Sequence, residues 1–199
     1  MTIILDMGGV LMLHNMPECI KRFCNMLGEK GMEQVLGMKI NAEGLPNSLM
    51  EQFECGFISK EEFIHTILSH AKVGTTEKEV IDAWNTMHAG IPQDRLEQLT
   101  QWKKDGHHLI LLSNNNAIHW EDIFEHYDMS IFDYCFASHI VHAHKPNKRI
   151  YEVVEQYLVD NQYEQPFHFV DDLEANRLVG ESMGWHTYAS LEELAHAMQ

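Results

Sequence analysis

A chain of 199 residues is long enough for one α/β domain that carries a modest insertion. Hydrophobic residues make up 45% of it, which supports a sizeable buried core and excludes a disordered chain. Lys and Arg number 14 against 30 Asp and Glu, giving a net charge of −16. That field repels polyanions and argues against nucleic acid as a partner. A small phosphorylated metabolite stays compatible with it, because a metal ion and one Lys reverse the field locally.

The cysteines and the first residues bear on where the protein works. The four cysteines form no CxxC pair and lie among apolar runs, which predicts reduced thiols of an intracellular protein. The chain begins directly with an apolar run and has no basic leader, and no stretch is long enough to span a bilayer. We therefore expect a cytoplasmic protein with no membrane partner.

The first predicted element is a strand at residues 3–5, a short apolar run typical of a strand buried on both faces. Strand signals then nearly vanish up to residue 90, and helical patterns replace them. Residues 18–27 place four apolar side chains on one helical face, and capping boxes at 59–62 and 76–79 each precede an apolar helical stripe. This pattern predicts a helical cap domain, residues 14–90, inserted after the first strand.

From residue 92 onward, helices and strands alternate. The predicted elements are a helix at 92–105, a strand at 109–112, a helix at 147–158, a strand at 167–170, a helix at 173–183, a strand at 185–188 and a helix at 191–198. Such alternation predicts the α/β class, a doubly wound parallel sheet with a Rossmann-like core. The core domain is expected to comprise residues 1–13 and 91–199.

Polar side chains follow three of the predicted strands. Asp6 follows the first strand, Ser113 the second and Asp171-Asp172 the third, and Lys145 precedes the helix at 147. In an open parallel sheet, ligands bind outside the carboxyl ends of the strands. Carboxylates, a hydroxyl and an ammonium at that edge can bind Mg²⁺ through oxygen and hold a phosphoryl group.

These motifs, in this order, resemble those of the haloacid dehalogenase-like hydrolase superfamily. The four motifs are Asp6-Met7-Gly8-Gly9-Val10, then Leu111-Leu112-Ser113-Asn114, then Lys145-Pro146, then Val170-Asp171-Asp172 followed, after three intervening residues, by Asn176. The helical insertion resembles the cap of the helical-cap subfamily, and residues 53–63 (FECGFISKEEF) are similar to a segment common there. The resemblance extends over the whole chain.

The resemblance implies a magnesium-dependent phosphatase acting on a small organic phosphate, with sugar phosphates among the candidates. Asp6 is the implied nucleophile, forming an aspartyl-phosphate that water hydrolyses. Ser113 and the backbone N–H of Asn114 would hold phosphate oxygens, and Lys145 would offset the negative charge. The implied metal ligands and their orienting residue are Asp6, the backbone carbonyl of Gly8, Asp171, Asp172 and, as the orienting group, Asn176.

Gly8 departs from the family pattern. Most phosphatases of the family carry a second Asp at this position, which protonates the leaving oxygen, a function typically worth ~10²–10⁴-fold in rate. Three explanations stay open. The cap supplies an acid, with His14 or a cap carboxylate as candidates; the leaving group departs with little protonation, as from a sugar 1-phosphate or an aryl phosphate; or the chain is a phosphometabolite-binding or regulatory protein that has lost hydrolysis.

Two further alternatives are weaker. A 2-haloacid dehalogenase would use Asp6 on carbon, but its chemistry does not require the two charges of Asp171-Asp172, which suit a cation. Three neighbouring histidines, His139, His142 and His144, would allow a zinc or iron site. Their spacing matches no helical ligand pair, so an oxygen-ligated site is favoured.

Overall fold

The computed structural model describes residues 1–36 and 48–198 and divides into two compact units. Residues 37–47 of the predicted cap lie outside the described part. The first unit, which we call the α/β unit, consists of Met1–Leu13, Gly90–Asn114 and Asp128–Gln199, and the second, the helical unit, consists of His14–Ala89 and Asn115–Tyr127.

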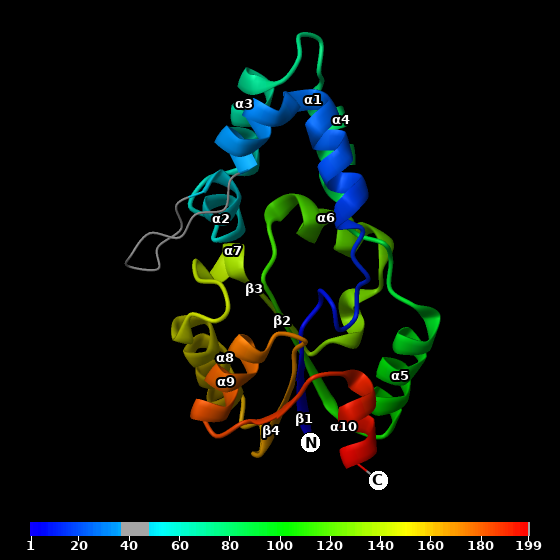
Figure 1. The fold of residues 1–199 in the computed structure, drawn as a ribbon. Coiled ribbons are helices and arrows are strands. Elements are labelled where there is room, and N and C mark those ends of the chain that lie inside the picture. Colours follow the sequence, from blue (N-terminus) through cyan, green and yellow to red (C-terminus); the bar gives the residue numbers. More distant parts are fainter. Residues whose placement is uncertain (37–47, 199) are drawn as a thin grey trace. The chain divides into compact units, whose positions relative to one another are not determined.

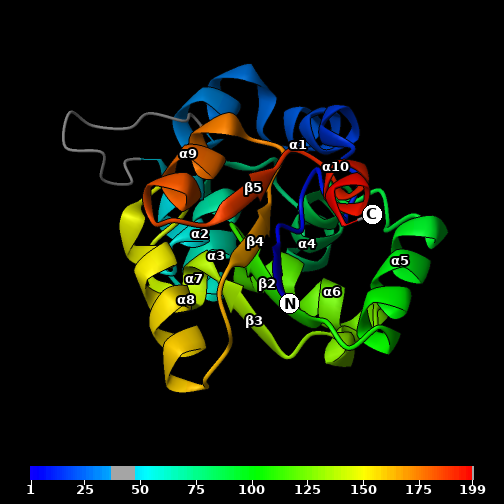
Figure 2. The same cartoon turned by 90° about the horizontal axis from the view of Figure 1, so that it is seen from below.

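A five-stranded sheet forms the centre of the α/β unit (Figures 1 and 2). Its strands are β1 Thr2–Leu5, β2 His108–Ser113, β3 Tyr134–Ala137, β4 Phe167–Val170 and β5 His186–Tyr188. They lie in the order β3-β2-β1-β4-β5, and every neighbouring pair is parallel. The predicted parallel α/β sheet is confirmed, with β1 fully buried at its centre.

Helices cover both faces of this sheet. They are α5 Gln93–Lys104, α7 Ser138–Val141, α8 Lys148–Asp160, α9 Glu174–Ser182 and α10 Leu191–Ala197, with a short 3-10 helix at Met129–Ile131. Figure 2 shows α8 and α9 on one face and α5 and α10 on the other. Under α8, the side chains of Tyr151, Val154 and Leu158 pack with Ile4 and Phe169 of the strands, so the apolar stripe of the helix matches the apolar face of the sheet.

The helical unit is built from α1 Met16–Leu36, α2 Leu49–Glu54, α3 Lys60–His70, α4 Glu77–Asn85 and α6 Ala117–His126. The capping boxes predicted at Ser59 and Thr76 are present, each closing on a Glu three residues later. The unit has its own core, in which Phe63 and Trp84 meet ring to ring.

Helix α6 was not predicted from the sequence, and its residues fell within the range expected for the core domain, 91–199; its contacts group it with the helical unit. The reason is packing, because Ile118 joins the cluster around Trp84. That the two units are independent domains stays a prediction.

The topology brings β1 and β4 together at the centre of the sheet. The connection from β1 leads to β2 and β3 on one side, whereas β4 and β5 lie on the other, so the switch point falls between β1 and β4. The backbone N–H of Asp6 donates to the carbonyl of Val170 at 2.9 Å, which ties the two strand ends together. Any ligand site at this edge would therefore include Asp6 and the residues after Val170.

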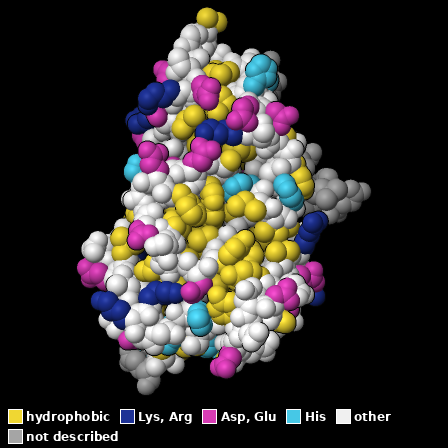
Figure 3. All heavy atoms as spheres, turned by 180° about the vertical axis from the view of Figure 1, so that it is seen from behind, with side chains coloured by type: hydrophobic (Ala, Val, Ile, Leu, Met, Phe, Trp, Pro, Cys, Tyr) yellow, Lys and Arg dark blue, Asp and Glu magenta, His cyan; other side chains and the backbone are white. Residues whose placement is uncertain are grey.

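Two general properties of the chain can be checked against the structure. No described helix is both long and apolar enough to cross a membrane. On the face drawn in Figure 3, acidic side chains are scattered, with Lys and Arg among them, so the net charge of −16 is not concentrated in one patch there.

Candidate active site

Asp6 stands at the carboxyl end of the central strand, with its side chain 10% exposed. Its Oδ1 accepts the backbone N–H of Met7 at 2.7 Å and lies 2.8 Å from the ammonium of Lys145. Both contacts fall on one oxygen. Within the described part of the chain, Oδ2 is therefore the oxygen available to a cation or to a phosphorus atom.

Lys145 links two carboxylates from different strands. Its Nζ lies 2.8 Å from Asp6 Oδ1 and 2.6 Å from Asp171 Oδ2, and the side chain is only 1% exposed. An ammonium this buried is stable only with close anions, and here it has two. Its Nζ also lies 5.7 Å from the centre of the Phe169 ring. Lys145 thus holds a positive charge at the switch point of the sheet.

Asp171 is the most extensively bonded acid of the site and is fully buried. Besides Lys145, it accepts hydrogen bonds from the N–H of Leu173 at 3.0 Å and from the amide Nδ2 of Asn176 at 2.9 and 3.0 Å. Asn176 sits in the first turns of α9 and is itself held by its carbonyl, which accepts the hydroxyl of Tyr151 at 3.0 Å. These bonds fix the orientation of the Asp171 carboxyl group.

Asp172 completes a group of three carboxylates. Asp6, Asp171 and Asp172 each offer an oxygen within 4.8 Å of the others, and this is the only such group of three or more His, Cys, Asp or Glu among the described residues. Asp172 is exposed and leans over Gly9, where an added Cβ would meet its Oδ2 at 2.5 Å. Three hard oxygen donors converging this closely, with glycine making room for one of them, fit Mg²⁺.

Burial raises the pKa of Asp6 from 3.8 to about 6. Lys145 opposes this effect, and the neighbouring charge of Asp171 adds to it. A carboxylate whose charge costs this much to bury is a frequent feature of functional sites.

The structure brings Asp6, Lys145, Asp171, Asp172 and Asn176 together, as the sequence motifs predicted. Ser113 is buried at the end of β2, and its hydroxyl lies 3.3 Å from the carbonyl of Asn114. Among the described residues, no hydrogen bond joins Ser113 to Asp6 or to Lys145. Its role, and that of the Asn114 N–H, stay predictions.

Gly8 lies in a tight loop that follows β1. The loop closes through the N–H of Gly9, which donates to the carbonyl of Met12 at 3.0 Å. The guanidinium of Arg95, on α5, donates to the carbonyls of Val10 at 2.6 Å and Leu11 at 3.2 Å. The loop carrying Gly8 is therefore fixed from both sides, and the use of its carbonyl as a metal ligand stays a prediction.

Arg177 was missed by sequence reasoning. Its Nη1 donates to the backbone carbonyls of Asp171 at 2.8 Å and Asp172 at 2.9 Å, so it pins the loop that presents both carboxylates. Its place directly after Asn176 was the only signal, and a basic residue on a helix is too common for that to be informative.

The histidine alternatives have other surroundings. His144 bonds to the carbonyl of Lys145 through Nδ1, and His139, His142 and His144 form no three-residue metal group. His14, the candidate acid, belongs to the helical unit, where its backbone pairs with that of His88.

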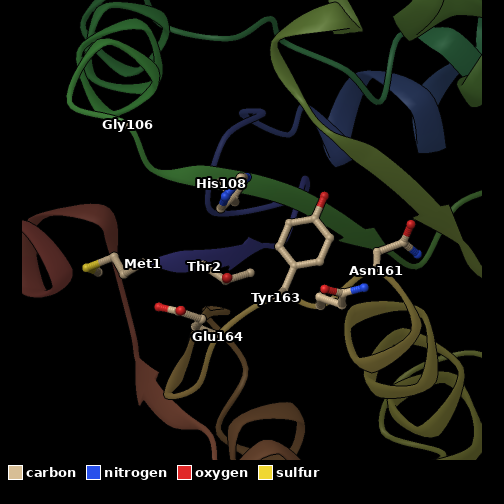
Figure 4. Close-up of a pocket in the computed structure, with 8 residues that line it drawn as sticks. Met1, Thr2, Gly106, His108, Asn161, Tyr163 and Glu164 are labelled. Atoms are coloured by element: carbon tan, nitrogen blue, oxygen red, sulfur yellow. The ribbon is translucent and has the colours of Figure 1, made fainter.

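An open hollow of about 550 Å³ lies at the opposite edge of the sheet (Figure 4). It opens beside Thr2 and His108, at the amino ends of β1 and β2, and the ring of Tyr163 stands against His108. Glu164 is the only carboxylate that lines it, so this hollow lacks the acidic group found around Asp6.

The fold and this acidic edge define the class of the protein: a Rossmann-like α/β fold of the haloacid dehalogenase (HAD) type. No family model matches the chain, and a search of curated proteins gave no match. Solved structures do match. A HAD family enzyme of Bacteroides thetaiotaomicron has a TM-score of 0.81 at 25% identity, over 100% of this chain and 98% of that one.

A predicted HAD-like family hydrolase of Porphyromonas gingivalis matches with a TM-score of 0.80 at 25% identity, over 100% of this chain and 97% of that one. The Bacteroides enzyme was also crystallised with magnesium and inorganic phosphate; that structure has a TM-score of 0.79 at 25% identity and covers 94% of this chain and 92% of the other. An L-2-haloacid dehalogenase, at 14% identity and a TM-score of 0.59, shares the fold alone. The resemblance found in the sequence is confirmed, and the chain has the fold of the HAD-like hydrolases.

Proposed function

We propose that the chain is a magnesium-dependent phosphatase that hydrolyses a small organic phosphate through an aspartyl-phosphate on Asp6. The observation that carries the proposal is the convergence of Asp6, Lys145, Asp171 and Asp172 on one edge of the sheet. An anionic nucleophile and a phosphate dianion repel each other, so the reaction needs positive charge between them. This edge supplies an ammonium and a donor set for a divalent cation.

The metal would be held by carboxylate oxygens of Asp6, Asp171 and Asp172, with the carbonyl of Gly8 as the further protein ligand. When bound, Mg²⁺ would add positive charge beside the transferring phosphoryl group. The Bacteroides relative crystallised with magnesium and phosphate supports this choice of ion.

The residues of the chain would act in two steps. Asp6 Oδ2 attacks phosphorus, and the leaving oxygen departs with the bonding electron pair. Lys145 holds Oδ1 of Asp6, so that Oδ2 faces the substrate, while Ser113 and the N–H of Asn114 bind phosphate oxygens. Water then attacks the phosphorus of the acyl phosphate, which releases inorganic phosphate and restores the carboxylate of Asp6.

Gly8 sets the expected substrate class. Without an acid at this position, the leaving oxygen must depart with little protonation, which favours substrates whose leaving group is already stable. Aryl phosphates and sugar 1-phosphates meet this requirement better than simple alkyl phosphates. If an acid of the helical unit replaces the missing one, the preference disappears. A series of phosphate esters with graded leaving groups therefore decides between the two.

The same glycine favours a second candidate, a phosphometabolite-binding or regulatory protein that keeps the metal and phosphate sites without turnover. The assay is release of p-nitrophenol from p-nitrophenyl phosphate with Mg²⁺. Asp6→Asn should abolish it, whereas Asp160→Asn, at the exposed end of α8, should leave it unchanged.

Three outcomes separate the candidates. Loss of activity in Asp6→Asn and after chelation supports the phosphatase. An inactive wild-type protein that still binds Mg²⁺ supports the binding protein. Halide release from a 2-haloacid that resists chelators would instead indicate a dehalogenase.

A further inference from the structure

The backbone of Lys145 is held by side chains at both of its polar groups. Its N–H donates to Oδ1 of Asn114 at 2.7 Å, and its carbonyl accepts from Nδ2 of the same Asn114 at 2.9 Å. One side-chain amide thus pairs with both backbone groups of one residue, 31 positions further along the chain. We call this arrangement the Asn114 clamp.

The orientation of the clamp follows from the chemistry of its partners. The oxygen of the Asn114 amide faces the N–H of Lys145, and its nitrogen faces the carbonyl of Lys145. If the amide were rotated by 180°, two donors would meet at one contact and two acceptors at the other. The Nδ1 of His144 also lies 2.8 Å from the carbonyl of Lys145. A carbonyl only accepts, so His144 must carry a proton on Nδ1 and donate. Three side-chain hydrogen bonds therefore fix one backbone residue.

The backbone held by the clamp is that of Lys145, the residue whose side chain bridges two carboxylates. The ammonium of Lys145 lies at 2.8 Å from Asp6 and at 2.6 Å from Asp171. Lysine has a flexible four-carbon stem, so a defined place for its charge requires a defined backbone. Asn114 itself follows Ser113 at the end of β2. The clamp thus ties the backbone of Lys145, and with it the ammonium, to the end of strand β2.

We infer that the side chain of Asn114 is a positioning residue, which holds the backbone of Lys145 so that its ammonium reaches Asp6 and Asp171 together. The inference rests on the proposed function and is distinct from the phosphate-binding role expected of the Asn114 backbone N–H. A displacement of about 1 Å in a catalytic group can cost about 10²-fold in rate. Loss of the clamp should therefore lower kcat more than it changes KM.

The first test measures the clamp without any turnover. Asn114→Leu keeps the size of the side chain and removes both hydrogen bonds, and Asn114 is exposed, so the variant should fold. Amide hydrogen exchange of Lys145, followed by NMR, should accelerate at least about 10-fold. The control is Asn147→Ala, which removes an N-cap bond to Arg149 N–H of 3.0 Å two residues after Lys145. It should leave the Lys145 amide unchanged. Unchanged exchange in Asn114→Leu would overturn the inference.

The second test measures the consequence for catalysis with p-nitrophenyl phosphate and Mg²⁺. Asn114→Leu should lower kcat about 10–100-fold while KM changes less than about 3-fold. Asn114→Asp, which can still accept the Lys145 N–H, should lie between wild type and Asn114→Leu. Asn147→Ala should keep the wild-type kcat.

The outcomes distinguish this inference from the proposed function. A wild type that turns over, with an Asn114→Leu variant of equal kcat, overturns the inference alone. A rise in KM at constant kcat also overturns it, because that result assigns the side chain to substrate binding. A wild type without activity overturns the proposed phosphatase, and the exchange experiment still decides whether Asn114 holds Lys145.

Discussion

The two units each contain a buried polar cluster, and the two clusters differ in charge. The cluster of the α/β unit is ionic, since the ammonium of Lys145 stands between the carboxylates of Asp6 and Asp171. In the helical unit, a network of neutral groups is buried around Trp84. Trp84 donates its Nε1–H to Asn116 at 3.2 Å, and Asn116 donates to Nδ1 of His119 at 3.2 Å.

The neutral network closes on itself. Nε2 of His119 lies 3.0 Å from the carbonyl of Trp84, so this nitrogen carries the proton and Nδ1 accepts from Asn116. Burial lowers the pKa of His119 from 6.5 to about 3. Every polar atom of the ring is satisfied inside the unit, whereas Asp6 keeps one oxygen for a ligand. Buried polar groups whose hydrogen bonds are all made inside the protein indicate a structural role. A buried ion with an oxygen left for a ligand indicates a binding or catalytic role.

The largest expected effect comes from removing the cation of the ionic cluster. Lys145→Met leaves two buried carboxylates without their partner, and breaking a buried pair in this way costs about 3–5 kcal/mol. Urea unfolding of the metal-free protein should show that loss in the free energy of unfolding. Mg²⁺ should recover part of it, because the divalent ion would compensate the same carboxylates.

Lys148→Met is the matched control for this variant. Lys148 lies three residues further on, in α8, and pairs with Glu152 at 3.3 Å with its side chain 63% exposed. An exposed pair of this kind contributes about 0–1 kcal/mol. Equal losses in the two lysine variants would show that Lys145 does not compensate buried charge.

The neutral cluster should respond to acid. The pKa of His119 is lower in the folded protein than in the unfolded chain, so the unfolded state binds more protons below pH 6.5. Stability is therefore lost as the pH falls from 6.5 toward 3, by about 2 kcal/mol at pH 5 for this one group. In His119→Gln, the loss of unfolding free energy between pH 7 and pH 5 should be smaller by that amount.

His126→Gln, on the same helix α6, is the control, because the pKa of His126 is shifted in the opposite direction to that of His119. A hydrogen bond to the carbonyl of Asp122 raises the pKa of the exposed His126, so its contribution is present at low pH and is lost as the pH rises. This variant should retain the acid sensitivity of the wild type. Identical pH dependence of wild type and His119→Gln would show that His119 does not stay neutral in the fold.

A smaller effect is expected at Asp6 itself. Its pKa is raised mainly by burial, to about 6, so at pH 7 its negative charge opposes folding when no metal is bound. Asp6→Asn should therefore raise the free energy of unfolding of the metal-free protein by roughly 1 kcal/mol, which corresponds to a rise of a few degrees in the melting temperature. Well below pH 3.8 the carboxyl is protonated in both states, and the difference should vanish. A variant that is inactive and less stable would contradict this account of Asp6.

The sequence predicted the strands that are mostly buried. Strands β1 and β4 lie between neighbours on both sides, so most of their positions are buried and carry aliphatic or aromatic residues. Strand β3 was missed because it lies at the sheet edge, with Tyr134 exposed and Cys135 half-buried, which leaves no clear pattern.

The site was predictable where motifs encode single residues, and unpredictable where function depends on pairs distant in the chain. Asp6, Lys145 and Asp171 carry the motif chemistry themselves. The Asn114 clamp spans 31 positions, and nothing in the sequence pairs its amide with the Lys145 backbone. His119 is similar, since its ring is neutral only because α4 and α6 pack together.

The smallest expected effect tests the surface of the helical unit. Lys60, in α3, pairs with Glu121 of α6 at 2.5 Å, with side chains 24% and 62% exposed. This pair joins α6 to the helices before it, yet water competes for both charges and salt screens them. Lys60→Met should lower the free energy of unfolding by less than about 1 kcal/mol, and 0.5 M NaCl should remove the difference. A loss as large as that of Lys145→Met would mean that α6 is held to the helical unit by charge rather than by the packing of Ile118, and that ionic bonding supports both units.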